Sequence, residues 1–321
     1  MKINRIIQRT AALLAAILGL VSCSHSAPEP VKPAPKKPLA SYLIMETYSG
    51  RVLYSGNPNE LRPIGMLTNI ATALVILDWI ESSKISMEKE LTVPVAACRW
   101  QKTNLLNLAP GDRITLRDAL HSAIMWDDSA CAETLAYACG STINSLDPMD
   151  AFLNQLNQMG KTIGMKATNF KGASGAIVTM SDTYDMAKLG MYAMQKPVFR
   201  NICIKRDYEA KVNGSRKVKI VNSNAMLKNP AIDGIRAARS SSAGCCLMAT
   251  TYRPGVRLIN PRTGQEATYP QRLLAVVLGA TSSERRYNGT AILLRDGWKA
   301  WEDWQKTDDF SDLSKFILLP R

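Results

Sequence analysis

Helical periodicity dominates the middle of the chain, from about residue 66 to about residue 205. In "TLRDALHSAIM" the apolar residues Leu116, Leu120 and Ile124 recur at a spacing that places them on one face of a helix. The stretch from Met66 to about Ser82 is instead apolar on nearly all sides, which is typical of a buried helix. The central region is therefore predicted to be helical.

Capping residues predict where these helices begin and end. Side chains of Ser, Thr and Asp accept hydrogen bonds from free N–H groups of a first turn, and Gly favours helix ends. The predicted helices are one begun by Thr115 with Asp118 three residues on, one over Ser129–Cys139 stopped by Gly140, one from Asp147 and Pro148 to Met159 closed by Gly160, and one capped by Ser181.

Strand-like segments lie on both sides of this helical region. "SYLIMETYSGRVLYSG" predicts a hairpin with its turn at Ser49 and Gly50. After Asp207 the segments "YEAKV", "RKVKIV", "GCCLMATTY" and "QRLLAVVLGAT" have strand character, and a last helix is predicted from about Asn288 to Trp304. This order predicts an α+β fold, in which both chain ends build an antiparallel sheet and the helical region, about 66–205, is inserted between them.

The first 39 residues have the composition of an export signal and a tether. Lys2, Arg5 and Arg9 precede "AALLAAILGLV", which is too short to span a bilayer and has the features of a signal peptide. The run ends before Cys23 in a pattern that resembles the lipobox of bacterial lipoproteins, where the Cys thiol is lipidated; the alternative is a plain secretory signal with an incidental Cys. We expect an exported protein, lipid-anchored to a bacterial membrane, with a signal peptide over 1–22, a Pro- and Lys-rich tether over 23–39, a domain over 40–305 and a tail over 306–321.

The charge of the chain is strongly positive. Its formal net charge is +13, and removing residues 1–22 takes away Lys2, Arg5 and Arg9 and no acidic residue, so 13 − 3 leaves +10. A basic exported protein is suited to an anionic neighbourhood such as lipid headgroups or cell-wall polymer. Nucleic acid is disfavoured as a partner because no basic–aromatic nucleic-acid motif accompanies the charge.

Cysteine and histidine positions predict no metal site, and no cofactor is expected. The six cysteines after Cys23 have spacings that match no zinc pattern, and His25 and His121 form no cluster with them. An oxidising compartment permits disulfides, but buried free thiols are favoured for most of these residues. Cys245 and Cys246 are neighbours in a strand-like run, so their side chains should point to opposite faces. The six are Cys98, Cys131, Cys139, Cys203, Cys245 and Cys246.

Several segments together resemble the serine D-alanyl-D-alanine carboxypeptidases, the low-molecular-mass penicillin-binding proteins. "SYLIMETYSGRVLYSGNPNELRPIGMLTNIAT" is similar to the family's opening hairpin and following helix, and "LAPGDRITLRDALHSAIMWDDSACAETLA" to its second-motif region. "MKATNF" resembles a connection between helices, and "IDGIRAARSSSAGCCLMATT" the third-motif strand with the next strand. The resemblance covers roughly residues 40–305 and implies a β-lactamase/transpeptidase-like fold.

At the three motif positions that this resemblance implies, the family's residues are replaced. The family uses Ser-x-x-Lys, in which the Lys helps to deprotonate a nucleophilic Ser. Here these positions are Met66 and Asn69, and neither a thioether nor an amide can take over those roles. Only the positive charge of Arg236 is kept from the other motifs, and it could meet a ligand carboxylate. The second and third motifs fall on Trp126, Asp127 and Asp128, and on Arg236, Ala237 and Ala238.

Two local matches to these motifs are interpreted as surface segments. The literal Ser-x-x-Lys from Ser86 to Lys89 lies in a polar segment beyond the buried helix, and Arg262-Thr263-Gly264 lies in a polar insertion between two predicted strands. Among nearby hydroxyl groups, Thr68 should point away from residue 66, and Ser129 is expected to be a helix N-cap.

The expected protein is thus a lipoprotein pseudoenzyme that binds peptidoglycan or its stem peptide or serves as a cell-wall scaffold. Two alternatives stay open: an active serine-type carboxypeptidase with non-standard residues, and an interaction protein with a filled cleft. In the family geometry, Asp127 or Asp128 should pair with Arg236 or Arg239. Trp126 should fill the space of the family's second-motif serine.

Overall fold

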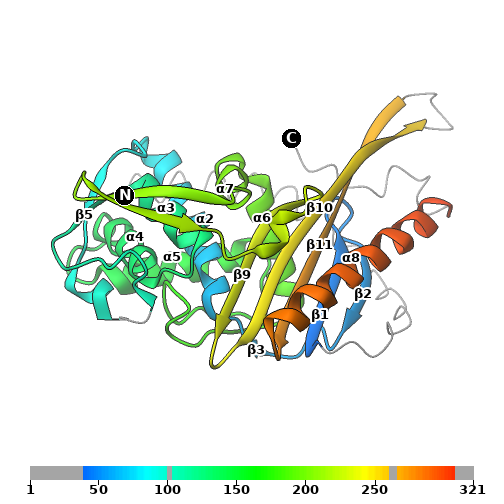
Figure 1. The fold of residues 1–321 in the computed structure, drawn as a ribbon, viewed down its shortest axis with the longest axis horizontal. Helices are drawn as coiled ribbons and strands as arrows, with labels where there is room; N and C mark the ends of the chain where they lie inside the picture. Colours follow the sequence, from blue (N-terminus) through cyan, green and yellow to red (C-terminus); the bar gives the residue numbers. More distant parts are fainter. Residues whose placement is uncertain (1–38, 100–102, 260–265, 308–321) are drawn as a thin grey trace.

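The main layer of the protein is a five-stranded antiparallel sheet (Figure 1). The computed structural model describes residues 39–99, 103–259 and 266–307. The strand order is β2-β1-β11-β10-β9, so segments from both ends of the chain lie side by side. This confirms the predicted α+β architecture. The strands are β1 (Ser41–Glu46), β2 (Val52–Gly56), β9 (Ile232–Ser240), β10 (Gly244–Ile259) and β11 (Glu266–Ala280).

The segment between β2 and β9 contains most of the helices and two small sheets. β3 (Arg62–Pro63) pairs with β6 (Met180–Ser181), and a four-stranded sheet has the order β4-β5-β7-β8. Its strands are β4 (Glu90–Thr92), β5 (Arg113–Thr115), β7 (Asp207–Val212) and β8 (Arg216–Val221). The helices are η1 (Gly65–Leu67), α2 (Thr68–Ser83), η2 (Val95–Arg99), α3 (Leu116–Met125), α4 (Ser129–Ser141), α5 (Pro148–Thr162), α6 (Thr183–Gln195), α7 (Pro197–Cys203) and η4 (Ala225–Lys228).

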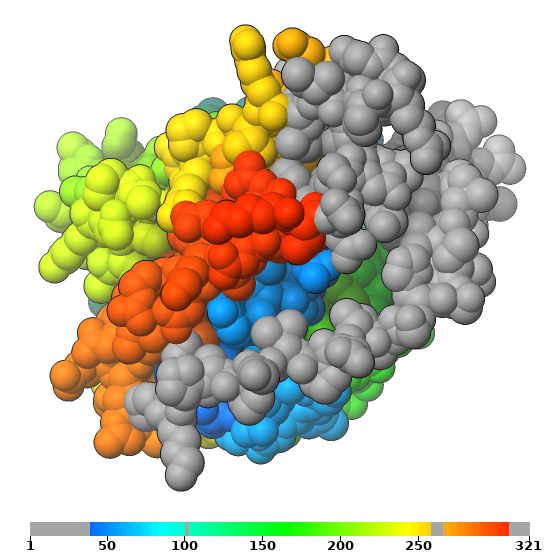
Figure 2. Space-filling model, turned by 90° about the vertical axis from the view of Figure 1, so that its right-hand side faces the viewer, coloured from blue at the N-terminus to red at the C-terminus, as the bar shows by residue number. Residues whose placement is uncertain are grey.

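Hydrophobic cores lie on both faces of the main sheet, because successive strand residues point to opposite sides. Leu43 and Met45 of β1 belong to the larger core, which the central helices cover. Ile44 belongs to the smaller core, which α8 (Ser283–Gln305) covers. Figure 2 shows α8 in orange and red, crossing the molecule beside the blue residues of β1 and β2.

The approach of α8 to the sheet depends on a glycine. A Cβ atom at Gly297 would lie 2.8 Å from Cγ2 of Ile44, so a larger residue would push the helix away from β1. Three tryptophans follow on the same side of the helix, Trp298, Trp301 and Trp304, and all are buried in the smaller core. Their large apolar area explains why this 23-residue helix stays on the sheet.

The six cysteines after Cys23 are buried, and none of them forms a disulfide with another described residue, as expected for most of them. Cys245 lies in the smaller core and Cys246 in the larger one, which confirms that they point to opposite faces. Burial raises the pKa of the Cys139 thiol to about 12 and that of Cys246 to about 11, so these thiols stay protonated and unreactive. Within the described residues there is no His/Cys/Asp/Glu group that could hold a metal ion.

Several predicted helix ends are confirmed and others are wrong. Thr115 caps α3 and Asp147 caps α5, with Pro148 as the first helical residue. The cap before α6 is Asp182 and not Ser181, because the Asp182 carboxylate accepts from the N–H of Asp185. Three further boundaries differ from the prediction. Helices α4 and α5 run past their predicted terminal glycines, Gly140 and Gly160, and α8 begins about five residues early, at Ser283. Helix α7 was not predicted from the sequence.

Some predictions fall on residues outside the described ranges. These are the lipid attachment at Cys23, the tether with His25, and the motif-like segment 262–264. The other motif-like segment, Ser86 to Lys89, is a solvent-exposed connection, as predicted. In the ranges that the structure describes, no helix is long and apolar enough to cross a membrane.

Candidate active site and its resident guanidinium

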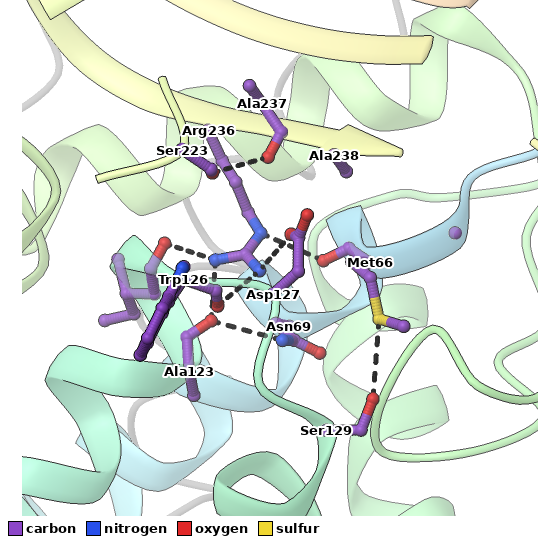
Figure 3. Close-up of polar contacts among 12 residues, drawn as sticks. Met66, Asn69, Ala123, Trp126, Asp127, Ser129, Ser223, Arg236, Ala237 and Ala238 are labelled. Atoms are coloured by element: carbon purple, nitrogen blue, oxygen red, sulfur yellow. Dashed lines mark hydrogen bonds and ion pairs between the residues drawn. The ribbon is translucent and has the colours of Figure 1, made fainter. Parts of the chain in front are cut away.

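The expected nucleophile position lies in a short, tightly packed turn. Met66 lies in η1 and is 4% exposed. The loop from 172 to 179 covers this turn so closely that a Cβ atom at Gly175 would lie 2.2 Å from the carbonyl carbon of Gly65. The sulfur of Met66 lies 3.6 Å from Oγ of Ser129, which donates to it (Figure 3). Position 66 therefore presents an apolar thioether in a closed environment.

Asn69 lies at the expected position of the base, at the start of α2, and is completely buried. Its Nδ2 donates to the carbonyl oxygen of Ala123 at 3.1 Å. Its Oδ1 has no hydrogen-bond partner within the described part of the chain. An amide neither accepts nor releases a proton near neutral pH, so this residue can position a neighbour but cannot act as a base.

Arg236 projects from β9 into the space between η1 and the end of α3 (Figure 3). Its side chain is 0% exposed. A guanidinium group has five N–H donors, and here each faces an oxygen atom. We call these five oxygens the acceptor cage: Met66 O at 3.0 Å from Nε, Ala123 O at 2.6 Å from Nη1, Ile124 O beside Nη1, and Trp126 O at 3.0 Å and Asp127 Oδ1 at 2.9 Å from Nη2.

The acceptor cage exists because α3 ends at this point. The last carbonyl groups of a helix have no partner within the helix and carry the negative end of its dipole. The carbonyls of Ala123, Ile124 and Trp126 accept from Arg236, and that of Met125 accepts from the N–H of Ser223 at 2.8 Å. Arg236 is thus the C-terminal cap of α3, supplied from the sheet.

The predicted ion pair is present between Arg236 and Asp127, whose side chain is 26% exposed. Burial raises the pKa of the Asp127 carboxyl, and Arg236 opposes this shift. Burial also lowers the pKa of Arg236, which the Asp127 carboxylate opposes. A guanidinium stays charged throughout the ordinary pH range, so the pair stabilises both charged groups.

The neighbouring candidates Asp128 and Arg239 have other roles. The Asp128 carboxylate caps α4 by accepting from the N–H of Cys131 at 2.9 Å, and it also accepts from the N–H of Leu106 at 2.9 Å. The expectation that Ser129 would be this cap is wrong, because Ser129 is the first residue inside the helix. Arg239 is exposed and forms no ion pair with a described residue.

Ala237 and Ala238 follow Arg236 on β9, the edge strand of the sheet. The carbonyl of Ala237 accepts from Oγ of Ser223 at 2.9 Å, and the carbonyl of Ala238 accepts from Nη1 of Arg286 at 2.9 Å. Both side chains are buried. These carbonyl groups of the strand are therefore already hydrogen-bonded within the protein.

Residues 30–264 match the sequence profile of the D-alanyl-D-alanine carboxypeptidase family. The chain belongs to this family. It is 28% identical over 306 residues to D-alanyl-D-alanine carboxypeptidase DacC of Escherichia coli, and this alignment covers 92% of this chain and 70% of DacC. It is 25% identical over 250 residues to D-alanyl-D-alanine carboxypeptidase DacF of Bacillus subtilis, and this alignment covers 77% of this chain and 58% of DacF.

Solved structures show the same fold. The Streptomyces K15 DD-transpeptidase superimposes with a TM-score of 0.71 at 21% sequence identity, covering 84% of this chain and 100% of that chain. Ampicillin-bound penicillin-binding protein D2 from Listeria monocytogenes superimposes with a TM-score of 0.67 at 21% identity, covering 83% of this chain and 100% of that chain. The penicillin-binding-protein-like fold is thereby confirmed.

In this carboxypeptidase-family protein, Arg236 does not offer its charge to a ligand. Its side chain has no exposed area, and its five N–H groups all face protein oxygens. In this geometry Arg236 has no N–H group left for the ligand carboxylate that the sequence analysis expected. Trp126 is half-buried against the larger core, and its contribution to the acceptor cage is its backbone carbonyl.

Three side chains at this site escaped the sequence analysis. Ser223 and Arg286 hold β9 from outside the motifs, and no local pattern marks them. Glu133, one turn after Ser129 on α4, accepts from Oγ of Ser174 at 2.8 Å, and burial raises its carboxyl pKa. A charged residue within an otherwise apolar helical stretch was the available signal for Glu133. It fixes the loop that covers Met66.

A separate cavity of about 200 Å³ lies on the four-stranded sheet and does not include the motif positions. Charged residues of both signs line it, among them Glu88, Arg117 and Asp118. Most of these charges are already paired: Arg117 Nε lies 2.6 Å from Glu88, and the Tyr208 hydroxyl donates to Asp118 at 2.7 Å. This cavity therefore lies apart from the positions that correspond to the family's motifs.

Proposed function

We propose that this D-alanyl-D-alanine carboxypeptidase-family protein is an envelope lipoprotein that no longer forms an acyl-enzyme. The observation that carries the proposal is the buried thioether of Met66 at the nucleophile position, with the neutral amide of Asn69 where a base is needed. A thioether sulfur cannot accept an acyl group to give a stable ester. In serine proteases, loss of the nucleophile alone lowers the rate on the order of a millionfold.

The internal hydrogen bonds at the motif positions support an interaction role over binding of a stem peptide there. Arg236 occupies the space between η1 and α3, and the carbonyls of Ala237 and Ala238 are bonded internally. We propose that the protein acts as a scaffold at peptidoglycan through its outer surface. The basic charge of the chain supports an anionic neighbourhood, and lipidation of Cys23 would hold the protein at a bacterial membrane.

Labelling with a fluorescent penicillin tests the loss of acylation. The full-length chain should show no covalent adduct by gel fluorescence or by intact mass, and penicillin-binding protein D2 from Listeria monocytogenes, treated in parallel, serves as the positive control. A stoichiometric adduct would refute the proposal. Peptide mapping would then show whether Ser129, whose hydroxyl donates to the sulfur of Met66, or Ser174, whose hydroxyl donates to Glu133, supplies a non-standard nucleophile.

Restoring the family residues gives a second test. Met66→Ser with Asn69→Lys should recover little labelling, because the second and third motifs are also replaced and Arg236 still occupies the cleft. Labelling close to that of the positive control would show that the cleft is open to substrates. Binding to purified sacculi, measured by co-sedimentation, tests the scaffold role, and its absence would remove peptidoglycan as the partner.

Lipid attachment is tested separately at Cys23. The Cys23→Ser variant should remain unprocessed or move from the detergent-extracted to the soluble fraction. Mass spectrometry of the N-terminal peptide of the parent should show the acyl modification. Unchanged fractionation together with an unmodified peptide would exclude lipidation and leave the secretory alternative.

A further inference from the structure

Four exposed apolar side chains lie on segments that are joined to each other beside the candidate site. One precedes β3, and the others belong to the loop that covers Met66 and to β6, which follows it. The segments are joined because β3 pairs with β6 and the N–H of Ile64 donates to the carbonyl of Thr179 at 3.1 Å. Exposed apolar side chains gathered on one surface are typical of a protein or membrane contact. The four are Leu61, Ile177, Val178 and Met180, and these residues are 51%, 44%, 47% and 40% exposed.

Residues 161–181 bring positive charge and no negative charge to the same surface. They include three lysines, all of them exposed, and no Asp or Glu. The N–H of Lys171 donates to Oγ1 of Thr179 at 3.1 Å, and Thr179 lies between Val178 and Met180 in the chain. The lysine-bearing segment is therefore held against the segment that carries the exposed apolar side chains.

The carboxylates that adjoin these lysines are already engaged. Glu60 lies 2.6 Å from Nη2 of Arg62. Asp185 is buried, accepts from the N–H of Lys166 at 3.0 Å, and lies 3.1 Å from Nζ of Lys188. Within the described ranges, the ammonium groups of Lys166 and Lys171 form no ion pair. We call Leu61, Lys166, Lys171, Ile177, Val178 and Met180 the apolar–basic surface.

The tether joins the domain beside this surface. Nδ2 of Asn57 donates to the carbonyl of Ala40 at 3.0 Å, and Nε of Arg62 donates to Oγ of Ser41 at 2.8 Å, so the start of β1 lies next to β3 (Figure 1). Residues 23–38 precede the described chain, and a segment of this length spans at most roughly 55 Å. A lipid at Cys23 would therefore be attached to the domain at the edge that carries the apolar–basic surface.

We infer that the apolar–basic surface binds an anionic lipid bilayer, with its apolar side chains in the headgroup region and its lysines against the lipid phosphates. The inference rests on the proposed envelope lipoprotein, because the anchor brings a bilayer within reach. A bilayer interface suits apolar side chains flanked by cations, whereas an anionic wall polymer would need the cations alone. In this orientation the loop over Met66 faces the bilayer, and the opposite side of the domain stays available for the scaffold role.

Position-specific fluorescence quenching tests the contact in the full-length protein. Val178→Cys is labelled with bimane and reconstituted into vesicles of phosphatidylcholine and phosphatidylglycerol that contain nitroxide-labelled lipid. The parent, labelled in parallel, gives the background, because its six cysteines after Cys23 are buried. We expect several-fold stronger quenching at position 178 than in Leu146→Cys, the matched control, which places the label at a 95% exposed leucine outside the apolar–basic surface.

Removing the two lysines tests the charge of the contact. A lysine near an anionic membrane strengthens binding by about fivefold, so Lys166→Gln with Lys171→Gln should weaken the contact by roughly 30-fold. Quenching at position 178 should then fall to its level in vesicles of phosphatidylcholine alone. The matched control is Lys211→Gln with Lys219→Gln, two exposed lysines on β7 and β8, and it should leave the quenching unchanged.

Two results would overturn the inference. One is equal quenching at positions 178 and 146, and the other is quenching at position 178 that depends neither on phosphatidylglycerol nor on the two lysines. Either result would favour a protein segment as the occupant of the surface. Failure of the lipoprotein proposal is read separately, from the mass of the peptide that contains Cys23. If that peptide carries no lipid, quenching at position 178 on mixing with the same anionic vesicles still decides whether the surface binds them.

Discussion

Two buried basic side chains at α3, Arg236 and His121, differ in charge. Arg236 meets the end of the helix and remains a cation beside Asp127. His121 lies within the helix, is 2% exposed, and bonds through Nδ1 to the carbonyl of Arg117 at 2.8 Å. Its Nε2 lies 3.2 Å from Nζ of Lys205, an ammonium that can only donate, so the ring is neutral and accepts.

The contrast shows that neighbours, and not burial alone, decide the charge of an interior group. Burial lowers the pKa of both bases. Around Arg236, five oxygens and a carboxylate stabilise the charged form, whereas Lys205 adds to the effect of burial at His121 and its pKa falls to about 4. His121 also stacks on Tyr208 with ring centroids 3.8 Å apart, which confirms its expected structural role.

The largest effect is expected from replacing Arg236 with an apolar residue. Arg236→Leu leaves the Asp127 carboxylate and four backbone carbonyls of the acceptor cage without their cation, so the free energy of unfolding should fall by about 3–5 kcal/mol. Chemical denaturation measures it. Arg239→Leu, an exposed arginine three residues along the same strand, is the matched control and should change stability by no more than about 0.5 kcal/mol. Similar losses in both variants would show that the acceptor cage contributes little.

His121 should make stability depend on pH in the acid range. Its folded pKa of about 4 lies below the ordinary 6.5, so the unfolded chain binds the proton more tightly. The contribution is complete above pH 6.5 and declines as the pH falls toward 4, by about 2 kcal/mol at pH 5.

Comparison with His121→Gln isolates this effect from that of the buried carboxyls. The parent should lose about 2 kcal/mol more than the variant between pH 7.5 and pH 5. The other histidine, His25, precedes the described residues and is present in both proteins. Parallel pH profiles for the two proteins would mean that His121 already binds a proton in the folded state.

A smaller loss is expected from removing the counter-charge alone. In Asp127→Asn the side-chain oxygen can still accept from Arg236, and the position is 26% exposed, so water offsets part of the change. We expect the free energy of unfolding to fall by about 1 kcal/mol. A loss as large as that of Arg236→Leu would show that the carboxylate, and not the end of α3, supplies most of the stabilisation.

The smallest effect is expected at a surface ion pair that is even shorter than the pair of Arg236 and Asp127. Arg117 and Glu88 lie 2.6 Å apart, but their side chains are 45% and 64% exposed. Glu88→Gln should therefore change the free energy of unfolding by about 0.5 kcal/mol or less, and added salt should abolish the difference. A larger, salt-resistant loss would contradict the view that desolvation separates this pair from the one in the acceptor cage.

Much of the architecture was predictable because its signals are local. A Thr three residues before an acidic residue marked the start of α3, and the hairpin turn at Ser49 and Gly50 marked the end of β1, since caps and turns act over a few residues. Helix ends were less predictable. Gly140 and Gly160 lie inside helices, because a glycine ends a helix only where the backbone turns left-handed, and neighbouring packing decides that.

The candidate site, too, was predictable from the sequence only in part. The order of residues alone establishes that positions 66 and 69 carry a thioether and an amide, and side-chain chemistry then excludes a serine-type nucleophile and its base there. The family resemblance favoured a contact of Asp127 or Asp128 with Arg236 or Arg239, and the structure forms it between Asp127 and Arg236. Ser223 and Arg286, which hold β9 beside these residues, had no such signal.

Only the tertiary structure decided that all the N–H groups of Arg236 would be hydrogen-bonded within the protein. Its partner Trp126 is 110 residues away in the chain, and the free carbonyls at the end of α3 meet the guanidinium only once β9 has joined the sheet. The same holds for His121, whose neutrality depends on Lys205, 84 residues further on. Charge states and occupied sites depend on the distances between segments remote in sequence, and those distances are set when the helices and the sheet pack together.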